Sequence, residues 1–582
     1  MLTDDRFLRE LNFRKNITVG FIIFLCLILI FNLYLLQIKH GHKYQLMSDK
    51  NRIRINPILP KRGRILSSDG QVLAQNIYKH RLMMDYCSKK VFDENMKSIK
   101  QYLDFSDEDE QALNLIRQQR QPSFLIKDEL TKEEYAKIAM NLFKFSGVYL
   151  IHIYSRQYYM PEEFSHVIGY ATKSDNSLQI LKGKTGIEFL FDEQLCGQIG
   201  TIQKEINAVG KNIRTIDQQP PKSGDDIILT INADLQKYVY QLLSQHKTGA
   251  CCVLDISGNV LALVSFPGYD INIMSNGPTK SEWNELNTNT FKPLLDRAIS
   301  SAYPPGSIFK IIVAYAALKE KIISPTDKII CLGGVKQDNH VFHCWNRGGH
   351  GWMNLCDALK FSCDSYFFEL AMKLGIEKIR KYALEFGFGQ QTGIELPNEK
   401  TGLIPSKEWK LLRYGSTWKP YETMIAGIGQ GSVLTTLIQT ATMMGKLYTN
   451  NFNYHPTIIK QTSKNEISPR PIDKQIGDII KKGLYQVCYS GTARGSCRTL
   501  YGISGKTGSS QVRSIKSHEA GMNQKLVEWQ HRDHAFFAGV APLNTPKYIV
   551  AVLVEHGGGG ASVAAPIARK VFDKLMEHDG IL

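Results

Sequence analysis

Apolar and polar residues follow different patterns in different parts of this chain. Residues 17–38, ITVGFIIFLCLILIFNLYLLQI, carry no charge. Roughly 20 consecutive apolar residues span a bilayer as a helix, so this segment is predicted to cross a membrane. The polar sequence KHGHKYQ follows at once, whereas a cleaved signal peptide has a shorter apolar core and a small-residue cleavage site. We therefore expect a retained transmembrane anchor over 17–38.

Basic residues flank the anchor on both sides. Residues 1–16 contain Arg6, Arg9 and Arg14, and the positive-inside rule favours a cytoplasmic tail there. The flank after the anchor is also basic, so charge alone gives a modest preference for this orientation. No later stretch is long and apolar enough to return across the membrane, and the rest of the chain is expected outside the cytoplasm.

Strand and helix patterns divide the rest of the chain in two. Residues 60–76, PKRGRILSSDGQVLAQN, predict a strand, a turn at Ser68-Asp69-Gly70 and a second strand. DQQPPKSGDD at 217–226 is rich in proline, glycine and charge, which is typical of a boundary. We expect an extended α+β module over 39–225 and a second domain over 226–582.

The second domain begins and ends with strand patterns. GACCVLDISGNVLALVSFP predicts two strands around the turn Ser257-Gly258-Asn259. Residues 305–450 are mainly helical in pattern, and DHAFFAGVAP and KYIVAVLVEHG predict two more strands before a last helix. This order predicts one sheet with a helix packed on it and a separate helical lobe, which is an α+β fold.

Composition narrows the function only a little. The chain has 582 residues, 43% of them hydrophobic, which suffices for sizeable cores in several domains. Its net charge of +16 suits anionic lipid headgroups or an anionic substrate, and a generally basic composition without a specific partner is an equal alternative. No interleaved basic and aromatic motif indicates nucleic-acid binding, so we expect no nucleic-acid partner.

Three Ser-x-x-Lys pairs could carry nucleophilic catalysis, because residues three apart share one face of a helix and the lysine can serve as base. Pro420 interrupts any helix that begins at Ser416. Ser244 falls at a helix C-terminus, whose negative partial charge opposes an oxyanion. Ser307 follows Pro304-Pro305-Gly306 and opens an apolar helix, where free N–H groups favour an anion.

Lys310 is expected one turn after Ser307, on the same face of that helix. Its apolar neighbours would desolvate the amine and favour a neutral base. The alternative is that Ser307 merely caps a core helix, and local features leave the two interpretations equally open.

The tripeptide Lys-Thr-Gly occurs four times, in GKTGIE, HKTGAC, EKTGLI and GKTGSS. A phosphate-binding loop is excluded, since Leu178 and Leu500 stand where its first glycine would be. Only GKTGSS lies in a strand-like segment after the Ser307 helix, with two further strands behind it. A lysine on such a sheet edge could hold a substrate carboxylate while the edge pairs with an extended peptide.

Ser307-x-x-Lys310 followed by Lys506-Thr507-Gly508 resembles the penicillin-binding, serine-transpeptidase family. RGRILSSDGQVLAQN, HVIGY, GKTGIE, SFPGYD, DRAISSAYPPGSIFK and GIGQGSVLTTLIQTA look like its elongation-specific class B members, the penicillin-binding protein 2 type. The resemblance covers nearly the whole chain after the anchor. It implies a non-catalytic pedestal of the dimerisation type over 39–225 and a transpeptidase domain over 226–582. No glycosyltransferase domain is visible, which speaks against a bifunctional class A enzyme.

The resemblance also implies a mechanism. Ser307 would attack the D-Ala-D-Ala carbonyl of a peptidoglycan stem peptide, Lys310 would take its proton, and an amine of a neighbouring stem would complete the cross-link. Backbone N–H groups of Ser307 and Ser509 would hold the oxyanion, and Lys506 and Thr507 the terminal carboxylate. β-Lactams would acylate the same serine.

The remaining expectations from the family concern the surroundings of the enzyme. Gly508 and Ser509 are expected to contribute to substrate binding. The chain would sit in a bacterial inner membrane, with its N-terminus in the cytoplasm and its catalytic domain in the periplasm, and would help determine cell shape. Its partners would include a membrane-embedded glycosyltransferase of the shape, elongation and division type and other elongation-complex proteins.

The family's third motif is Ser-x-Asn, and here the sequence departs from the pattern. Strict triplets occur at three places: Ser174, Ser257 and Ser463. Two of these precede the nucleophile and the third lies in a polar loop. The position that fits the family's order is Ser362-Cys363-Asp364, where Ser362 would relay a proton between Lys310 and the leaving amine. Ionised Asp364 accepts hydrogen bonds but cannot donate as an amide does, so its part in holding a substrate amide stays open.

Four of the eleven cysteines fall between 331 and 363. A four-coordinate zinc site could be built from Cys331, Cys344, His350 and Cys363, with three spare candidates: His340, His343 and Cys356. The spacing matches no short zinc-finger pattern, but some elongation-type relatives carry a structural zinc here, so the resemblance favours the metal. The alternative is one disulfide with free thiols, which an exported domain permits. A metal at Cys363 would brace the Ser362 motif.

Two functions of other classes stay open. A β-lactamase-like hydrolase shares the nucleophile chemistry but needs neither anchor nor pedestal. A non-enzymatic β-lactam sensor or a scaffold of a wall-synthesis complex is the second. A single anchor with almost no cytoplasmic part speaks against a sensor, whereas Asp364 keeps a pseudoenzyme open.

Overall fold

The computed structural model describes residues 4–44, 53–105, 113, 115–116, 123–173, 180–206, 212–337, 340–460, 468–513 and 527–582. Its chain divides into two compact units, Met1–Lys61 with Gly197–Gly224 and Arg62–Cys196 with Asp225–Leu582. These units do not coincide with the predicted domains on either side of residue 225, because the chain enters the first unit twice.

The first unit holds the apolar helix. α1 (Asp4–Tyr34) continues into the π-helical turn η1 (Leu35–Lys39). Within the described residues, Phe7–Lys39 is long and apolar enough to cross a membrane and fits a single-pass anchor. The helix starts before residue 17 because extending a formed helix costs little once it is nucleated. The same unit contains an antiparallel sheet in the order β1 (Ile53–Ile58), β8 (Gly200–Ile206), β9 (Asn212–Gln219).

A five-stranded sheet occupies the N-terminal part of the second unit, in the order β10-β2-β3-β4 with β5 paired to β3. Its strands are β2 (Ile65–Leu66), β3 (Val72–Asp85), β4 (Ser123–Lys127), β5 (Val148–Tyr158) and β10 (Ile227–Ile228). β2 and β3 are the strand pair predicted over 60–76. Helices α3 (Lys89–Ile99) and α5 (Lys132–Asn141) share one apolar core with this sheet. A 3₁₀ turn η2 (Leu142–Lys144) ends α5.

A buried ion triad lies beside that sheet. Glu188, from α7 (Gly186–Leu190), accepts from Arg62 Nε at 2.7 Å and from Arg156 Nε at 2.7 Å, one on each carboxylate oxygen. The adjoining elements are α6 (Ser165–Ile168), β6 (Ala171–Lys173), β7 (Leu181–Gly183) and α8 (Asp192–Cys196). Here GKTGIE forms the turn from β7 into α7, which agrees with its predicted non-catalytic place.

The sheet predicted for the second domain has five strands in the order β12-β11-β19-β18-β17. The strands are β11 (Gly249–Asp255), β12 (Val260–Phe266), β17 (Ser504–Ser510), β18 (His534–Ala541) and β19 (Tyr548–Val554). The hairpin β11–β12 turns at Ser257, as predicted, and GKTGSS forms the edge strand β17. Strands from both ends of the domain therefore meet in one sheet.

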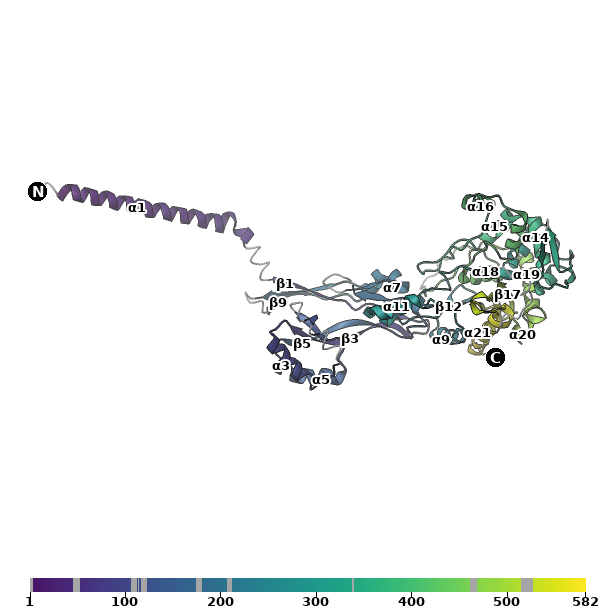
Figure 1. The fold of residues 1–582 in the computed structure, drawn as a ribbon. Helices are drawn as coiled ribbons and strands as arrows, with labels where there is room; N and C mark the ends of the chain where they lie inside the picture. The colour runs from purple at the N-terminus through teal and green to yellow at the C-terminus, as the bar shows by residue number, and fades with distance from the viewer. Residues whose placement is uncertain are drawn as a thin grey trace. The chain divides into compact units, whose positions relative to one another are not determined.

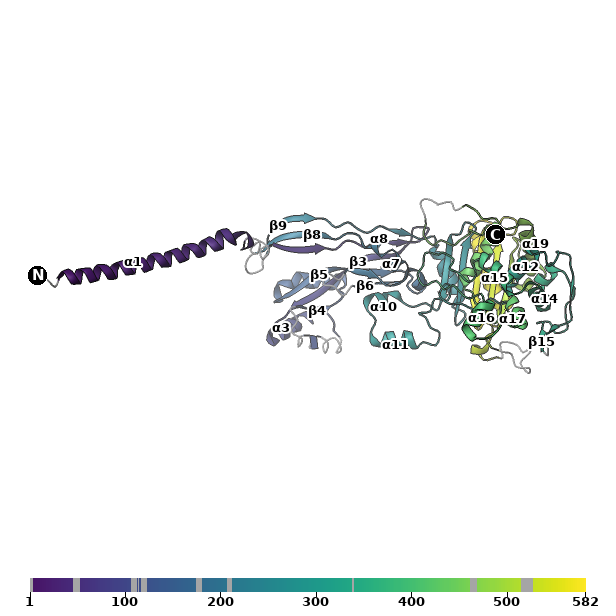
Figure 2. The same cartoon turned by 90° about the horizontal axis from the view of Figure 1, so that it is seen from above.

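Helices cover both faces of this sheet. α9 (Ala233–Leu243) and α21 (Ala565–His578) pack on one face and share a core with it (Figure 1). The other face packs on α18 (Leu437–Thr449), and α12 (Lys310–Lys319) belongs to the same large core of the helical lobe. The other helices of this part are α10 (Ile271–Asn276), α11 (Lys280–Thr288), α13 (Leu355–Lys360), α14 (Asp364–Leu374), α15 (Ile376–Glu385), α16 (Lys407–Tyr414), α17 (Pro420–Gly427), α19 (Lys474–Tyr489) and α20 (Arg494–Cys497), several of which are labelled in Figure 2.

Two small hairpin-like sheets accompany the helical lobe. β13 (Ile329–Cys331) pairs with β16 (Gly351–Met353), and β14 (Gly334–Gln337) pairs with β15 (His340–His343). Short helical turns complete the domain: η3 (Gly306–Ile308), η6 (Trp529–His531) and η7 (Gly560–Ala564). The small sheets carry the cysteine-rich segment and place it beside α14.

Candidate active site

An open cavity of about 780 Å³ borders β17 and the helical lobe. Ser307, Ser362, Asp364, Thr507 and Ser509 all contribute to its lining. Three stretches that lie far apart in the sequence therefore meet at one cavity, as the sequence predicted.

Ser307 lies half-buried in the 3₁₀ turn η3, and α12 begins three residues later at Lys310. The predicted helix start is thus displaced by one turn. Gly306 has φ +56°, and a Cβ there would lie 2.7 Å from the carbonyl oxygen of Ser509. Its N–H donates to Gly429 O at 2.9 Å. The glycine lets the turn that carries Ser307 approach the edge strand closely.

Lys310 is fully buried at the start of α12, as its apolar neighbours predicted. Its ammonium donates to Asp364 Oδ1 at 2.7 Å and to the Ser362 carbonyl at 2.8 Å. The Ser362 hydroxyl is 3.3 Å away. Asp364 is therefore the ion-pair partner of Lys310, a relation that sequence reasoning did not predict.

Lys506 is fully buried on β17, with its ammonium 2.8 Å from Ser362 Oγ and 3.2 Å from the Thr507 carbonyl. Burial, together with the positive charge of Lys310, lowers the pKa of Lys506 well below its ordinary value. Because Lys506 exposes no surface, a carboxylate in the cavity would meet Thr507 first. The Ser362 hydroxyl lies between the two lysines and can exchange a proton with either.

Ser362 occupies the short connection between α13 and α14 and has φ +53°, in the left-handed region that disfavours a side chain. Asp364 follows at the first residue of α14, and its Oδ2 accepts from the backbone N–H of Trp345 at 2.9 Å. Both carboxylate oxygens thus have protein donors. Of the strict triplets, Ser257 lies in the β11–β12 turn, and Ser174 and Ser463 lie outside the described residues.

The end of β17 is held against the Ser307 turn. A Cβ on Gly508 would lie 2.7 Å from the Pro305 carbonyl, so only glycine lets the strand come this close. The Ser509 carbonyl accepts from Gln430 Nε2 at 3.1 Å, and the Ser509 hydroxyl accepts from the Gly560 N–H at 3.2 Å. These contacts fix the strand beside the cavity.

Thr492 and Trp345 are among the cavity residues that sequence reasoning missed. Thr492 Oγ1 lies 3.2 Å from Thr507 Oγ1, so two hydroxyls face each other at the cavity wall. Trp345 also lines the cavity although it is 59% exposed. A tryptophan placed directly after a candidate metal ligand was a usable signal for the second, whereas Thr492 lies in a glycine-flanked loop without a distinctive pattern.

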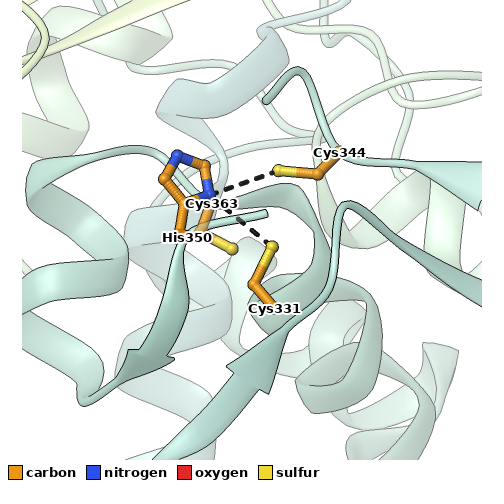
Figure 3. A group of neighbouring side chains, drawn as sticks. All are labelled: Cys331, Cys344, His350 and Cys363. Carbon is orange, nitrogen blue, oxygen red and sulfur yellow. Dashed lines mark hydrogen bonds between the residues drawn. The ribbon is translucent and has the colours of Figure 1, made fainter. Parts of the chain in front are cut away.

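The four predicted metal ligands converge at one point. The ligand atoms of Cys331, Cys344, His350 and Cys363 all lie within 4.8 Å of one another, and His350 Nδ1 is 3.6 Å from the sulfurs of Cys331 and Cys344 (Figure 3). With Zn–S bonds near 2.3 Å and Zn–N bonds near 2.0 Å, neighbouring ligands of a tetrahedral zinc are separated by about 3.6 Å. The donor set and its spacing therefore fit zinc.

The spare candidates lie outside this group. Cys356 instead directs its thiol at the Ile479 carbonyl, 3.8 Å away, and neither His340 nor His343 belongs to the cluster. All eleven cysteines are free thiols. A disulfide within the cluster is therefore not part of this structure.

Family comparisons agree with this geometry. A model of the penicillin-binding protein transpeptidase domain matches residues 249–573, and a model of the penicillin-binding protein dimerisation domain matches residues 57–229. The chain belongs to the penicillin-binding proteins. The predicted resemblance and the transpeptidase fold are confirmed.

Curated relatives of this penicillin-binding protein are named for one activity. The peptidoglycan D,D-transpeptidase MrdA of Haemophilus influenzae is 34% identical over 605 residues, which cover 97% of this chain and 92% of the relative. MrdA of Escherichia coli K12 is 32% identical over 587 residues, covering 95% and 92%. The predicted enzyme class, a peptidoglycan transpeptidase of the cell wall, is confirmed.

Solved structures give the same result. The penicillin-binding protein PBP2 in a complex with MreC from Helicobacter pylori superposes with a TM-score of 0.81 at 28% identity, covering 91% of this chain and 99% of that one. PBP2 of Pseudomonas aeruginosa in complex with WCK 5153 gives 0.68 at 30% identity, covering 90% and 97%. The neighbours are PBP2 proteins, which is the type indicated by the sequence.

Proposed function

We propose that this penicillin-binding protein cross-links stem peptides during cell-wall elongation through an acyl-enzyme on Ser307. The observation that carries the assignment is the hydroxyl of Ser362, which lies between Lys310 and Lys506 beside the cavity that Ser307 lines. A serine nucleophile needs a base and a route for its proton, and these groups supply both.

Acylation begins when Ser307 Oγ attacks the carbonyl of the penultimate D-Ala and Lys310, in its neutral form, takes the proton. The peptide bond breaks as the leaving D-Ala amine receives a proton through Ser362. Backbone N–H groups of Ser307 and Ser509 stabilise the oxyanion, because preorganised donors act where charge develops. An amine of a second stem then attacks the ester, and Ser307 recovers its proton.

Substrate orientation follows from the edge strand. Thr507 and Thr492 present hydroxyls to the cavity, and Lys506 behind them supplies positive charge for the terminal carboxylate. Gly508 and Ser509 offer the strand edge along which an extended stem peptide can pair. Asp364 serves chiefly Lys310, since its oxygens accept from that lysine and from Trp345.

The test is a cross-linking assay with the purified full-length protein and pentapeptide stems. Release of D-Ala and formation of cross-linked product are expected with wild type and absent with Ser307→Ala. Ser244→Ala is the matched control, because Ser244 begins the same Ser-x-x-Lys pattern away from the cavity. Product formation by the Ser307 variant would refute the assignment.

We also propose that Cys331, Cys344, His350 and Cys363 hold a structural zinc ion. Zinc bound there would fix β13, the Cys344–His350 loop and the start of α14 to one another, because each supplies a ligand. Cys363 separates Ser362 from Asp364, so this brace would reach the catalytic motif directly.

Metal analysis tests this part separately. We expect about one zinc ion per purified chain, lost on Cys344→Ala and retained on Cys356→Ala, which removes a thiol from the same segment outside the cluster. A zinc-free protein with full activity would contradict the proposal.

The anchor helix supports a location in the bacterial inner membrane, with residues 1–16 in the cytoplasm and the catalytic domain in the periplasm. Protease added to spheroplasts should degrade the chain after residue 39 and spare an N-terminal tag. Degradation of the tag alone would indicate the opposite orientation, with the N-terminus outside the cytoplasm.

The solved neighbours suggest the kind of partner. One is a complex with MreC, and another is described as the structural coordination of polymerization and crosslinking by a peptidoglycan synthase complex. We propose that this chain likewise works with a membrane-embedded glycan polymerase. We expect the full-length chain to co-purify with that polymerase from membranes. A variant in which an unrelated helix replaces the anchor helix should no longer co-purify. A chain that never co-purifies would count against the pairing.

A further inference from the structure

Trp345 lies between the cysteine cluster and the Ser362 motif. Its ring packs edge-on against His350, with centroids 5.2 Å apart. Its indole N–H donates to the carbonyls of Phe361 at 3.0 Å and Ser362 at 3.2 Å. Its backbone N–H donates to Asp364 Oδ2 at 2.9 Å. One residue thus contacts a candidate metal ligand and both polar groups that hold the catalytic lysine.

The groups that Trp345 holds are the same ones that orient Lys310. The Lys310 ammonium donates to the Ser362 carbonyl and to Asp364 Oδ1. Trp345 approaches the same carbonyl and the other oxygen of the same carboxylate. Neither acceptor can rotate without losing a Trp345 contact, so the positions of both are determined from two sides.

This arrangement decides where a neutral Lys310 points its lone pair. A neutral amine has two N–H donors and one lone pair. When the Ser362 carbonyl and Asp364 take the two donors, the lone pair is left for a hydroxyl proton. A base acts only when its orientation matches the proton it abstracts, so displaced acceptors would misdirect it.

The backbone at Ser362 supports the same conclusion. Its φ of +53° is a conformation that costs a non-glycine residue energy. Such a conformation persists where surrounding contacts impose it, and the contact to its carbonyl from the Trp345 indole is one of these. The unfavourable conformation thereby presents the Ser362 carbonyl to two donors at once.

We propose that Trp345 is a positioning residue for the acylation step: it fixes the Ser362 carbonyl and the Asp364 carboxylate so that both orient Lys310. This inference rests on the proposed role of Lys310 as the base for Ser307. It does not require Trp345 to touch the substrate, although the side chain borders the cavity.

The experiment measures β-lactam acylation of full-length protein and separates the dissociation constant of the first complex from the acylation rate constant. For Trp345→Ala we expect the rate constant to fall on the order of 100-fold, the effect of a displacement of about 1 Å in a reacting group, with an unchanged dissociation constant. Trp345→Phe keeps an aromatic ring and the backbone N–H but loses the indole donor, so its acylation rate constant should fall by about two- to tenfold. Trp352→Ala is the matched control, because Trp352 is 66% exposed in the same segment and does not line the cavity.

Each outcome of this experiment either supports or overturns the positioning role of Trp345. A change confined to the dissociation constant would make Trp345 a substrate contact and overturn the proposal, as would a Trp345→Ala rate constant equal to that of wild type. If Trp345→Ala fails to fold, Trp345→Phe decides alone, and an unchanged rate constant there would overturn it. Failure of the underlying assignment is distinguished by Ser307→Ala, which would then still become acylated.

Discussion

Two buried clusters in this protein each contain two cationic side chains and a carboxylate, and they differ in how these charges are paired. In the first, Arg62 and Arg156 donate to the two oxygens of Glu188, each at 2.7 Å. In the second, only Lys310 pairs with Asp364, and Lys506 contacts the Ser362 hydroxyl instead. In the first cluster both cations have a carboxylate partner, and Arg62 also pairs with Asp192 at 2.8 Å. In the second cluster Lys506 has no direct carboxylate partner among the described residues.

The proton affinities differ accordingly. Burial alone would raise the pKa of Glu188, but the adjacent charges of Arg156 and Arg62 hold it below its ordinary value. Burial and the charge of Lys310 lower the pKa of Lys506 well below its ordinary value. Arginine stays protonated in proteins, while lysine changes protonation readily when buried. The arginine triad therefore serves structure, and the lysine cluster can move protons.

Lys310→Arg should have the largest effect on chemistry. Arginine can still pair with Asp364 but cannot act as a base, so acylation by a β-lactam should fall by about 10³-fold or more. Stopped-flow acylation measures this, and thermal unfolding should show an intact fold. Rapid acylation by this variant would show that another group removes the proton of Ser307.

Glu188→Gln should have the largest effect on stability. It leaves the buried Arg156 with a neutral partner at this position, while Arg62 keeps Asp192 as a carboxylate partner. Breaking a buried pair in this way costs about 3–5 kcal/mol of unfolding free energy. Urea unfolding is the measurement, and Glu94→Gln, an exposed glutamate on α3, is the control. Acylation per folded molecule should be unchanged. A large loss of acylation in folded protein would contradict the assignment of a purely structural role to the Glu188 cluster.

Asp364→Asn should have a smaller effect than Lys310→Arg. The amide oxygen can still accept from Lys310, but the amide nitrogen would face the N–H of Trp345, so acylation should fall by up to about tenfold. The same acylation assay measures it. A loss as severe as that of Lys310→Arg would mean that the charge of Asp364, and not its acceptor geometry, is required.

Lys506→Met should give the smallest effect on stability, and this effect should depend on pH. The folded-state pKa of Lys506 lies below its ordinary value of 10.5. At pH values between the folded-state pKa and 10.5 the unfolded chain therefore binds more protons than the folded chain, and the free energy of unfolding rises with pH in that range. The variant lacks this rise. Its stability relative to wild type should therefore be higher at pH 7.5 than at pH 9.5 when both are measured by urea unfolding. A constant difference would show that Lys506 is not destabilised by burial.

The parts predicted from sequence were those with local signals. Gly306 and the apolar run after it located Ser307 and Lys310, and the strand pattern of GKTGSS located Lys506 on a sheet edge. The helix start was displaced because Gly306 adopts a left-handed turn that the sequence permits but does not require. The four metal candidates were found as residue types only, since their convergence depends on two small sheets that pair across the segment.

The parts that were missed depend on contacts between distant residues. Asp364 was expected to bind substrate, because nothing local shows that Lys310, 54 positions earlier, approaches it. Trp345 was not singled out, since its role needs the carbonyl of Ser362 and the ring of His350 in place. Thr492 meets Thr507 only once α19 and β17 are adjacent.

The central claim is that Ser307 is the nucleophile and Lys310 its base. The most direct test is to locate the residue that carries the covalent penicillin adduct. Full-length protein treated with a fluorescent penicillin should, after digestion and mass analysis, carry the adduct on the peptide that contains Ser307. The label should be absent from Ser307→Ala and reduced by about 10³-fold in rate in Lys310→Arg. An adduct on another serine, or persistent labelling of Ser307→Ala, would contradict the account.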